Sequence, residues 1–164
     1  PANFFHLLRR QIHWPFRKPL VVLTPKALLR HKACVSSLAE FGPGTAFTPV
    51  IVDAAVKRPK RVVLCTGKVY YELLQARAEN KLEKQVALVR IEQLWPFPAD
   101  ALAAALKPYS KAEFVWCEEE PENMGYFRHL APHIERLIGH VQSVVERTHG
   151  VRLVPEVRIV GEAV

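Results

Sequence analysis

The chain has 164 residues, of which 49% are hydrophobic and 24% are charged, and its formal net charge at pH 7 is +7. This composition is typical of a folded globular protein and excludes extensive disorder. No apolar run approaches the roughly 18 residues that a membrane-spanning helix needs, and the first residues lack a secretory signal pattern. Three widely spaced cysteines argue against a disulfide framework and favour a reducing compartment. Because the chain begins with Pro1 rather than Met, we expect it to be part of a longer protein.

The positive charge is concentrated at one end. Residues 1–61 contain 11 Lys or Arg against 2 acidic residues, whereas residues 62–164 contain 12 against 14. Such a basic segment is compatible with a polyanion site, with contact to an acidic partner, or with an ordinary solvated face. The polyanion hypothesis predicts binding that weakens steeply with salt. It also predicts one continuous exposed stripe, made of Arg9, Arg17, Lys32, Arg58, Lys60 and Arg61.

In chain order, the first predicted element is a helix over residues 3–13, with Asn3 as its N-cap and Pro15 just after its end. The apolar run at 20–24, LVVLT, predicts a short buried strand. A second, short helix is expected at 36–41. We predict that residues 1–41 are too few to hold a core of their own.

Residues 42–60, rich in Gly, Pro and basic side chains, are predicted to be a linker with one short strand near 47–52. From residue 61 to residue 164, strands and helices alternate. This alternation predicts an α/β domain with a mainly parallel sheet flanked by helices. The predicted strands are 61–66, 86–91, 113–117 and 151–160, and the predicted helices are 69–78, 99–106 and 126–145.

The stretch FVWCEEEPENMGYF, residues 114–127, places three adjacent carboxylates between a predicted strand and a long helix. The carboxyl ends of parallel strands are where ligands and partners bind. We interpret Glu118, Glu119, Asn123 and Gly125 as residues that form the helix start and a dimer interface. Acid–base catalysis is the alternative, but the loop contains no His or nucleophile that would assist it.

Two histidines four residues apart, His129 and His133, have a spacing that can bind zinc, although the H-E-x-x-H pattern is absent. Glycine-rich phosphate-binding motifs are also absent, and Cys65 and Cys117 are typical of small buried side chains. The sequence therefore predicts no catalytic residue and no metal site in this chain.

Two polar positions are candidates for ligand contact. Arg9 and Arg10 are adjacent on the first predicted helix and point in different directions, so one of them can face a partner or an anion. Gln93 follows a predicted strand, where a polar side chain can line a crevice.

Five ordered motifs carry a family resemblance: FHLLRRQ, RKPLVVLTPKALLRH, TGKVYYELL, VRIEQLWPFP and WCEEEPENMG. Together they resemble the C-terminal part of the decarboxylating first component of 2-oxoglutarate dehydrogenase, a transketolase-like thiamine-diphosphate family. The resemblance covers about residues 1–138. It implies that residues 1–41 are the end of a pyrimidine-binding domain. Residues 61–164 would then be the transketolase-like C-terminal domain. The related 2-oxoadipate component shares most of these motifs and remains an alternative.

The resemblance also implies an oxidoreductase of the tricarboxylic acid cycle. Its thiamine diphosphate and Mg²⁺ would be bound by residues outside this segment, which would be inactive alone. The implied partners are a second copy in a homodimer, a lipoyl succinyltransferase and dihydrolipoamide dehydrogenase, without nucleic acid or membrane. The implied location is the cytoplasm of a bacterium or the mitochondrial matrix of a eukaryote.

Some members of the family bind acetyl-CoA or a nucleotide near this domain. Arg10 and Gln93 match residues used there, whereas Asp100 and Ala101 replace a pair of arginines. The resemblance therefore implies an anionic effector site that differs from the acetyl-CoA site.

Overall fold

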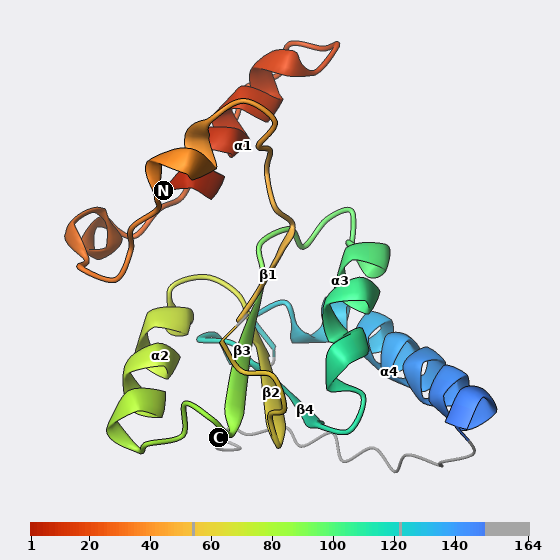
Figure 1. Ribbon diagram of the computed structural model, residues 1–164. Coiled ribbons are helices and arrows are strands. Elements are labelled where there is room, and N and C mark those ends of the chain that lie inside the picture. Colours follow the sequence, from red (N-terminus) through yellow and green to blue (C-terminus); the bar gives the residue numbers. More distant parts are fainter. Residues whose placement is uncertain (54, 122, 150–164) are drawn as a thin grey trace. The chain divides into compact units, whose positions relative to one another are not determined.

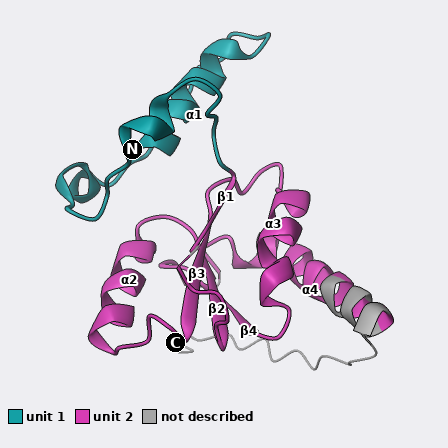
Figure 2. Cartoon of the chain, in the orientation of Figure 1, with its two compact units in different colours: residues 1–48 teal, residues 49–164 magenta. Residues whose placement is uncertain are grey.

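The computed structural model describes residues 1–53, 55–121 and 123–149. The chain forms two compact units, Pro1–Thr48 and Pro49–Val164 (Figure 2). The division falls inside the segment 42–60 that the sequence predicts as a linker. The predicted strand at 151–160 lies outside the described residues.

The first unit contains helix α1 (Ala2–His13) and two 3₁₀ turns, Lys26–Arg30 and Leu38–Phe41. Helix α1 begins one residue before Asn3, so the predicted N-cap is wrong. The Asn3 amide instead pairs with the backbone of Thr48, accepting its N–H at 2.8 Å and donating to its carbonyl at 3.1 Å.

The strand predicted at 20–24 is also wrong. These residues have no regular structure, and Val21 and Leu23 are 80% and 94% exposed. An apolar run indicates burial, but a strand also needs a neighbour for its backbone hydrogen bonds, and the first unit contains no other strand. Only Ala2 and His6 are buried in this unit. As expected, it has no core of its own.

The second unit is built on a four-stranded sheet of order β1-β3-β2-β4. The strands are β1 (Val50–Val52), β2 (Arg61–Cys65), β3 (Val86–Ile91) and β4 (Glu113–Cys117). Strand β2 pairs in parallel with both β3 and β4.

The α/β class is confirmed, but the sheet is mixed, because β1 pairs antiparallel with β3. The connection from β1 to β2 explains this direction. It has only eight residues, 53–60, whereas a return to the same end of the sheet needs a crossover of a dozen or more.

Helix α2 (Val69–Glu79) lies on one side of the sheet, and α3 (Ala99–Leu106) and α4 (Phe127–His149) lie on the other (Figure 1). The predicted helices are thus confirmed, with α4 extending four residues beyond its predicted end. Gly67, with φ of +71°, makes the turn between β2 and α2, a conformation that L side chains rarely adopt.

The main core lies between the sheet and the pair α3 and α4. Alternate residues of β2, Val62 and Leu64, face this core, and Val63 and Cys65 therefore face the side of α2. The buried core residues are Val50, Val56, Val62, Leu64, Ala87, Val89, Ile91, Leu102, Leu106, Tyr109, Leu130, Ile134, Leu137 and Ile138.

Candidate functional site

The acidic loop after β4 is built around the carboxylate of Glu118. Its Oε2 accepts the backbone N–H of Tyr126 at 2.9 Å, and its Oε1 accepts that of Phe127 at 3.3 Å. Because the first N–H groups of a helix have no partner within it, a carboxylate at this position stabilises the start of α4.

Gly125 makes this arrangement possible. A Cβ at position 125 would lie 2.5 Å from Cδ and 2.7 Å from Oε2 of Glu118, far inside normal contact distance. Asn123, the sequence-based candidate for the cap, is exposed, and the backbone N–H groups at the helix start go to Glu118 instead.

Glu119 forms an ion pair with Lys68 in the turn before α2, and both side chains are roughly half exposed, at 46% and 41%. The hydrogen bond that Lys68 donates to the Glu119 carboxylate raises the pKa of Lys68. The two glutamates thus hold a helix start and a neighbouring turn.

The two cysteines at the carboxyl ends of β2 and β4 are held as thiols. Burial raises the pKa of Cys65 to about 12. The pKa of Cys117 is also raised, by burial and then by the negative charge of Glu118. A protonated thiol is a weak nucleophile, so neither group is activated for catalysis.

His129 and His133 of α4 contact aromatic rings. His133 stacks on Phe97 with ring centroids 4.7 Å apart, His129 lies 5.6 Å from Trp95, and the two imidazoles are 5.4 Å apart. Across residues 1–53, 55–121 and 123–149, no three His, Cys, Asp or Glu side chains form a group that could hold a metal ion.

Within the same residues, no helix combines the length and the apolar character that a membrane crossing requires.

Arg10 and Arg9 point in different directions, as predicted. The Arg10 guanidinium lies over Phe47, 4.2 Å from the ring centroid, and over Trp14 at 5.3 Å. Partial burial lowers its pKa. Arg9 contacts His6 Nδ1 at 3.1 Å and the Thr45 carbonyl at 3.4 Å.

Gln93, in the loop after β3, donates to the carbonyl of Pro96 at 2.8 Å. It belongs to the second unit, whereas Arg10 belongs to the first. Their convergence on one crevice therefore stays a prediction.

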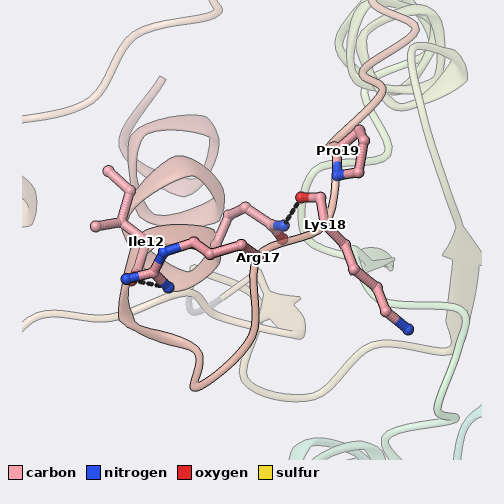
Figure 3. A pocket seen from close by; sticks show the side chains of 5 residues that line it. Ile12, Arg17, Lys18 and Pro19 are labelled. Atoms are coloured by element: carbon pink, nitrogen blue, oxygen red, sulfur yellow. Dashed lines mark hydrogen bonds between the residues drawn. The ribbon is translucent and has the colours of Figure 1, made fainter.

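A hollow of about 390 Å³ lies beyond the end of α1 and is lined by Gln11, Ile12, Arg17, Lys18 and Pro19 (Figure 3). The guanidinium of Arg17 turns back to the helix end, where it donates to the carbonyls of Ile12, Trp14 and Phe16. This arginine closes the helix end and is not an open anion site.

The residues of the predicted basic stripe belong to both units, so whether they form one continuous surface stays a prediction. One of its members, Arg61, is paired with Glu113 at 2.7 Å.

Sequence reasoning missed a polar network behind β1. Asp53 forms an ion pair with Arg77 of α2, the exposed fractions of their side chains are 15% and 11%, and Arg77 also donates to the carbonyl of Val86. The Tyr109 hydroxyl donates to the Asp53 carbonyl at 3.2 Å. The sequence did contain one indication of this ion pair, because Asp53 is one of only two acidic residues among residues 1–61.

The fold is an α/β domain with helices on both sides of the sheet, and the Glu118 carboxylate of the acidic loop caps the start of α4. The chain belongs to the family described as 2-oxoglutarate dehydrogenase C-terminal, whose model matches residues 35–154. This match and the relatives below confirm the resemblance to the C-terminal part of the first component of 2-oxoglutarate dehydrogenase.

Curated relatives agree with this assignment. The chain is 48% identical over 149 residues, 88% of its length, to the Rattus norvegicus protein named 2-oxoglutarate dehydrogenase-like, mitochondrial. It is 45% identical over 159 residues, 90% of its length, to the 2-oxoglutarate dehydrogenase E1 component of Brucella ovis. The chain spans 15% and 16% of the length of these two relatives.

Proposed function

We propose that this chain is the C-terminal segment of the decarboxylating component of 2-oxoglutarate dehydrogenase. The complete subunit carries out thiamine-diphosphate-dependent oxidative decarboxylation of 2-oxoglutarate and passes the succinyl group to a lipoyl acyltransferase that works with dihydrolipoamide dehydrogenase. The observation that carries the proposal is the family match over residues 35–154. The names of relatives at 45–48% identity support it.

Within that subunit the segment has a structural role. Its described residues do not fit a pyrophosphate–Mg²⁺ site, because they form no metal-ligand cluster and the leading carboxylates are engaged by backbone N–H groups and Lys68. We propose that thiamine diphosphate and Mg²⁺ are bound by residues elsewhere in the subunit.

The first unit is the end of the pyrimidine-binding domain. Support comes from its lack of a core and from its exposed apolar side chains, which need cover from other parts of the subunit. The most exposed are Leu23 at 94%, Leu38 at 90%, Val21 at 80%, Leu29 at 74%, Val35 at 73% and Ile12 at 69%.

The loop 118–126 belongs to the interface of a homodimer. Met124 and Tyr126 in this loop are 77% and 51% exposed, and Met and Tyr are enriched in protein interfaces. Glu118 accepts the backbone N–H of Tyr126, and Gly125 leaves room for its carboxylate, which supports a preformed surface at Tyr126.

Arg10 and Gln93 contribute to an anionic effector site. Two aromatic rings fix the Arg10 guanidinium, and a fixed guanidinium loses less freedom when it binds phosphate or carboxylate. Titration of the chain with acetyl-CoA and with AMP tests this site. Arg10→Ala should weaken binding at least tenfold, and Lys32→Ala, a matched loss of one exposed charge, should leave it unchanged.

The function is tested on the full-length subunit that carries this segment. Decarboxylation of 2-oxoglutarate and of 2-oxoadipate is measured with an artificial electron acceptor, with and without thiamine diphosphate and Mg²⁺. We expect a kcat/KM for 2-oxoglutarate at least tenfold above that for 2-oxoadipate, and no turnover without the cofactor. A reversed preference would assign the segment to the 2-oxoadipate component, and cofactor-independent turnover would refute the proposal.

A further inference from the structure

Two of the three cysteines occupy matched positions on neighbouring strands. Cys65 ends β2, Cys117 ends β4, and the two are register partners in a parallel pair. Neighbouring strands lie about 4.8 Å apart, a separation within the Cα–Cα range of disulfides, roughly 4.4–6.8 Å.

The side chains of this pair lie on the same face of the sheet. Leu64 belongs to the core beneath α3 and α4, and its register partner Trp116 packs against that core. Since side chains alternate along a strand, Cys65 and Cys117 both face the opposite side, where α2 lies (Figure 1). The register places the two thiols beside each other, and the Cys117 side chain contributes, after burial, to the raised pKa of Cys65.

The two thiols differ in access. Cys65 is fully buried, whereas Cys117 is partly exposed at the end of the edge strand. An external oxidant therefore meets Cys117 first, and Cys65 stands beside it as the second thiol. Cys34 is partly exposed and belongs to the first unit, so it has no register partner in this sheet.

We propose that Cys65 and Cys117 form a dithiol site that a hydroperoxide converts into an intramolecular disulfide. The Cys117 thiolate attacks the peroxide, the O–O bond breaks, an alcohol or water leaves, and Cys117 becomes a sulfenic acid. The Cys65 sulfur then attacks the Cys117 sulfur, and the sulfenic oxygen leaves as water with the Cys65 proton. Two thiols lose two electrons and two protons in total, and one hydroperoxide is reduced.

The charges around the pair set the speed of this reaction. Glu72 of α2, Glu92 after β3 and Glu118 after β4 disfavour the thiolates, and Arg90 of β3 favours that of Cys65. The thiolate is the reactive form. Because both pKa values are raised, the thiolate fraction grows steeply between pH 7 and pH 9, and oxidation should be slow at pH 7 and more than about tenfold faster at pH 9.

The disulfide would join the ends of β2 and β4, and the residue that follows each cysteine makes a structural contact. The next residue after Cys65 is Thr66, whose hydroxyl donates to the Ile91 carbonyl at 2.8 Å. The next residue after Cys117 is Glu118, which caps α4. A disulfide at Cys117 would therefore constrain the start of the loop 118–126, which the proposed function places in the dimer interface.

The test treats the complete 164-residue chain with one equivalent of hydrogen peroxide, blocks the remaining thiols and digests it with trypsin. We expect the peptide 62–68 joined to the peptide 112–128 as the main disulfide product. Met124, the single methionine, reports the oxidant dose in every sample. Cys117→Ser should abolish the cross-linked product, and Cys34→Ser should leave its yield unchanged.

Two results would overturn the proposal. One is accumulation of Cys117 as sulfinic acid while Cys65 stays a free thiol. The other is an unchanged preference for the 65–117 pair after the chain is unfolded in urea, since the proposal attributes the preference to strand register. Loss of the preference in urea is the supporting outcome.

Discussion

Replacement of Gly125 by Ala tests how the acidic loop starts α4. The added Cβ would meet the Glu118 carboxylate at 2.5–2.7 Å, so the carboxylate must leave. Its departure breaks the hydrogen bonds to the Tyr126 and Phe127 N–H groups. Loss of a side-chain cap costs about 0.5–2 kcal/mol, and we expect about 1–2 kcal/mol here because the acceptor is charged.

Hydrogen exchange at the amides of Tyr126 and Phe127 measures this loss where it occurs. A cost of about 1.4 kcal/mol corresponds to a roughly tenfold increase in local opening, and therefore in exchange rate. Urea unfolding followed by circular dichroism should show a destabilisation of similar size.

The matched control is Gly139→Ala in the same helix. A Cβ at position 139 meets nothing within 4 Å. Alanine there should stabilise α4 by about 0.5–1 kcal/mol, because glycine is a poor helix former. The two glycine substitutions should thus have opposite signs.

A double-mutant cycle supplies the decisive comparison. Once Glu118→Ala has removed the carboxylate, the Cβ at position 125 no longer collides with it, and Gly125→Ala should become neutral or slightly stabilising. If Gly125→Ala destabilises the chain equally with and without Glu118, the carboxylate is not what the glycine accommodates, and the reasoning fails.

Three further predictions concern ion pairs and thiols. Asp53→Ala leaves the nearly buried Arg77 without its counter-ion and should cost about 3–5 kcal/mol in urea unfolding; a cost below about 1 kcal/mol would show that the pair is solvated. Arg61→Ala breaks a pair whose arginine is 47% exposed and should cost less than about 1 kcal/mol in the same assay; a cost as large as that at Asp53 would contradict the assigned exposure. With a pKa of about 12, Cys65 is less than about 0.1% thiolate at pH 8. Iodoacetamide should therefore label Cys34 and Cys117 first, and Cys65 only after unfolding. Equal labelling of all three cysteines in the folded chain would refute the assigned burial.

The second unit could be predicted from sequence because its patterns are local. The apolar run RVVLC gave a strand buried on both faces, and Gly67 marked the turn that follows it. The antiparallel direction of β1 could not be predicted, since it depends on the length of the connection 53–60 and on pairing with β3. The register partner of Val52 is Val89, 37 positions along the chain.

The first unit shows where pattern reasoning fails. The run at 20–24 has the composition of a buried strand, yet its residues are largely exposed and unpaired with any strand of this unit. Asn3 has a good capping side chain but bonds to Thr48, 45 residues away. Both errors arise because a local pattern does not reveal a long-range partner.

The candidate site was predicted in part. The acidic loop could be located from the sequence. Which group each glutamate contacts could not, because this depends on residues that the folded chain brings near. Glu118 reaches N–H groups eight and nine residues ahead, and Glu119 reaches Lys68 on a different connection. Neither contact follows from the spacing of residues within one helix.

The central claim is that this chain completes a larger thiamine-diphosphate enzyme and performs no catalysis alone. The most direct measurement is release of CO₂ from 2-oxoglutarate by the purified 164-residue chain, supplied with thiamine diphosphate, Mg²⁺ and an electron acceptor. The account predicts release no faster than in the same mixture without protein. Cofactor-dependent release of CO₂ by the chain alone would contradict it.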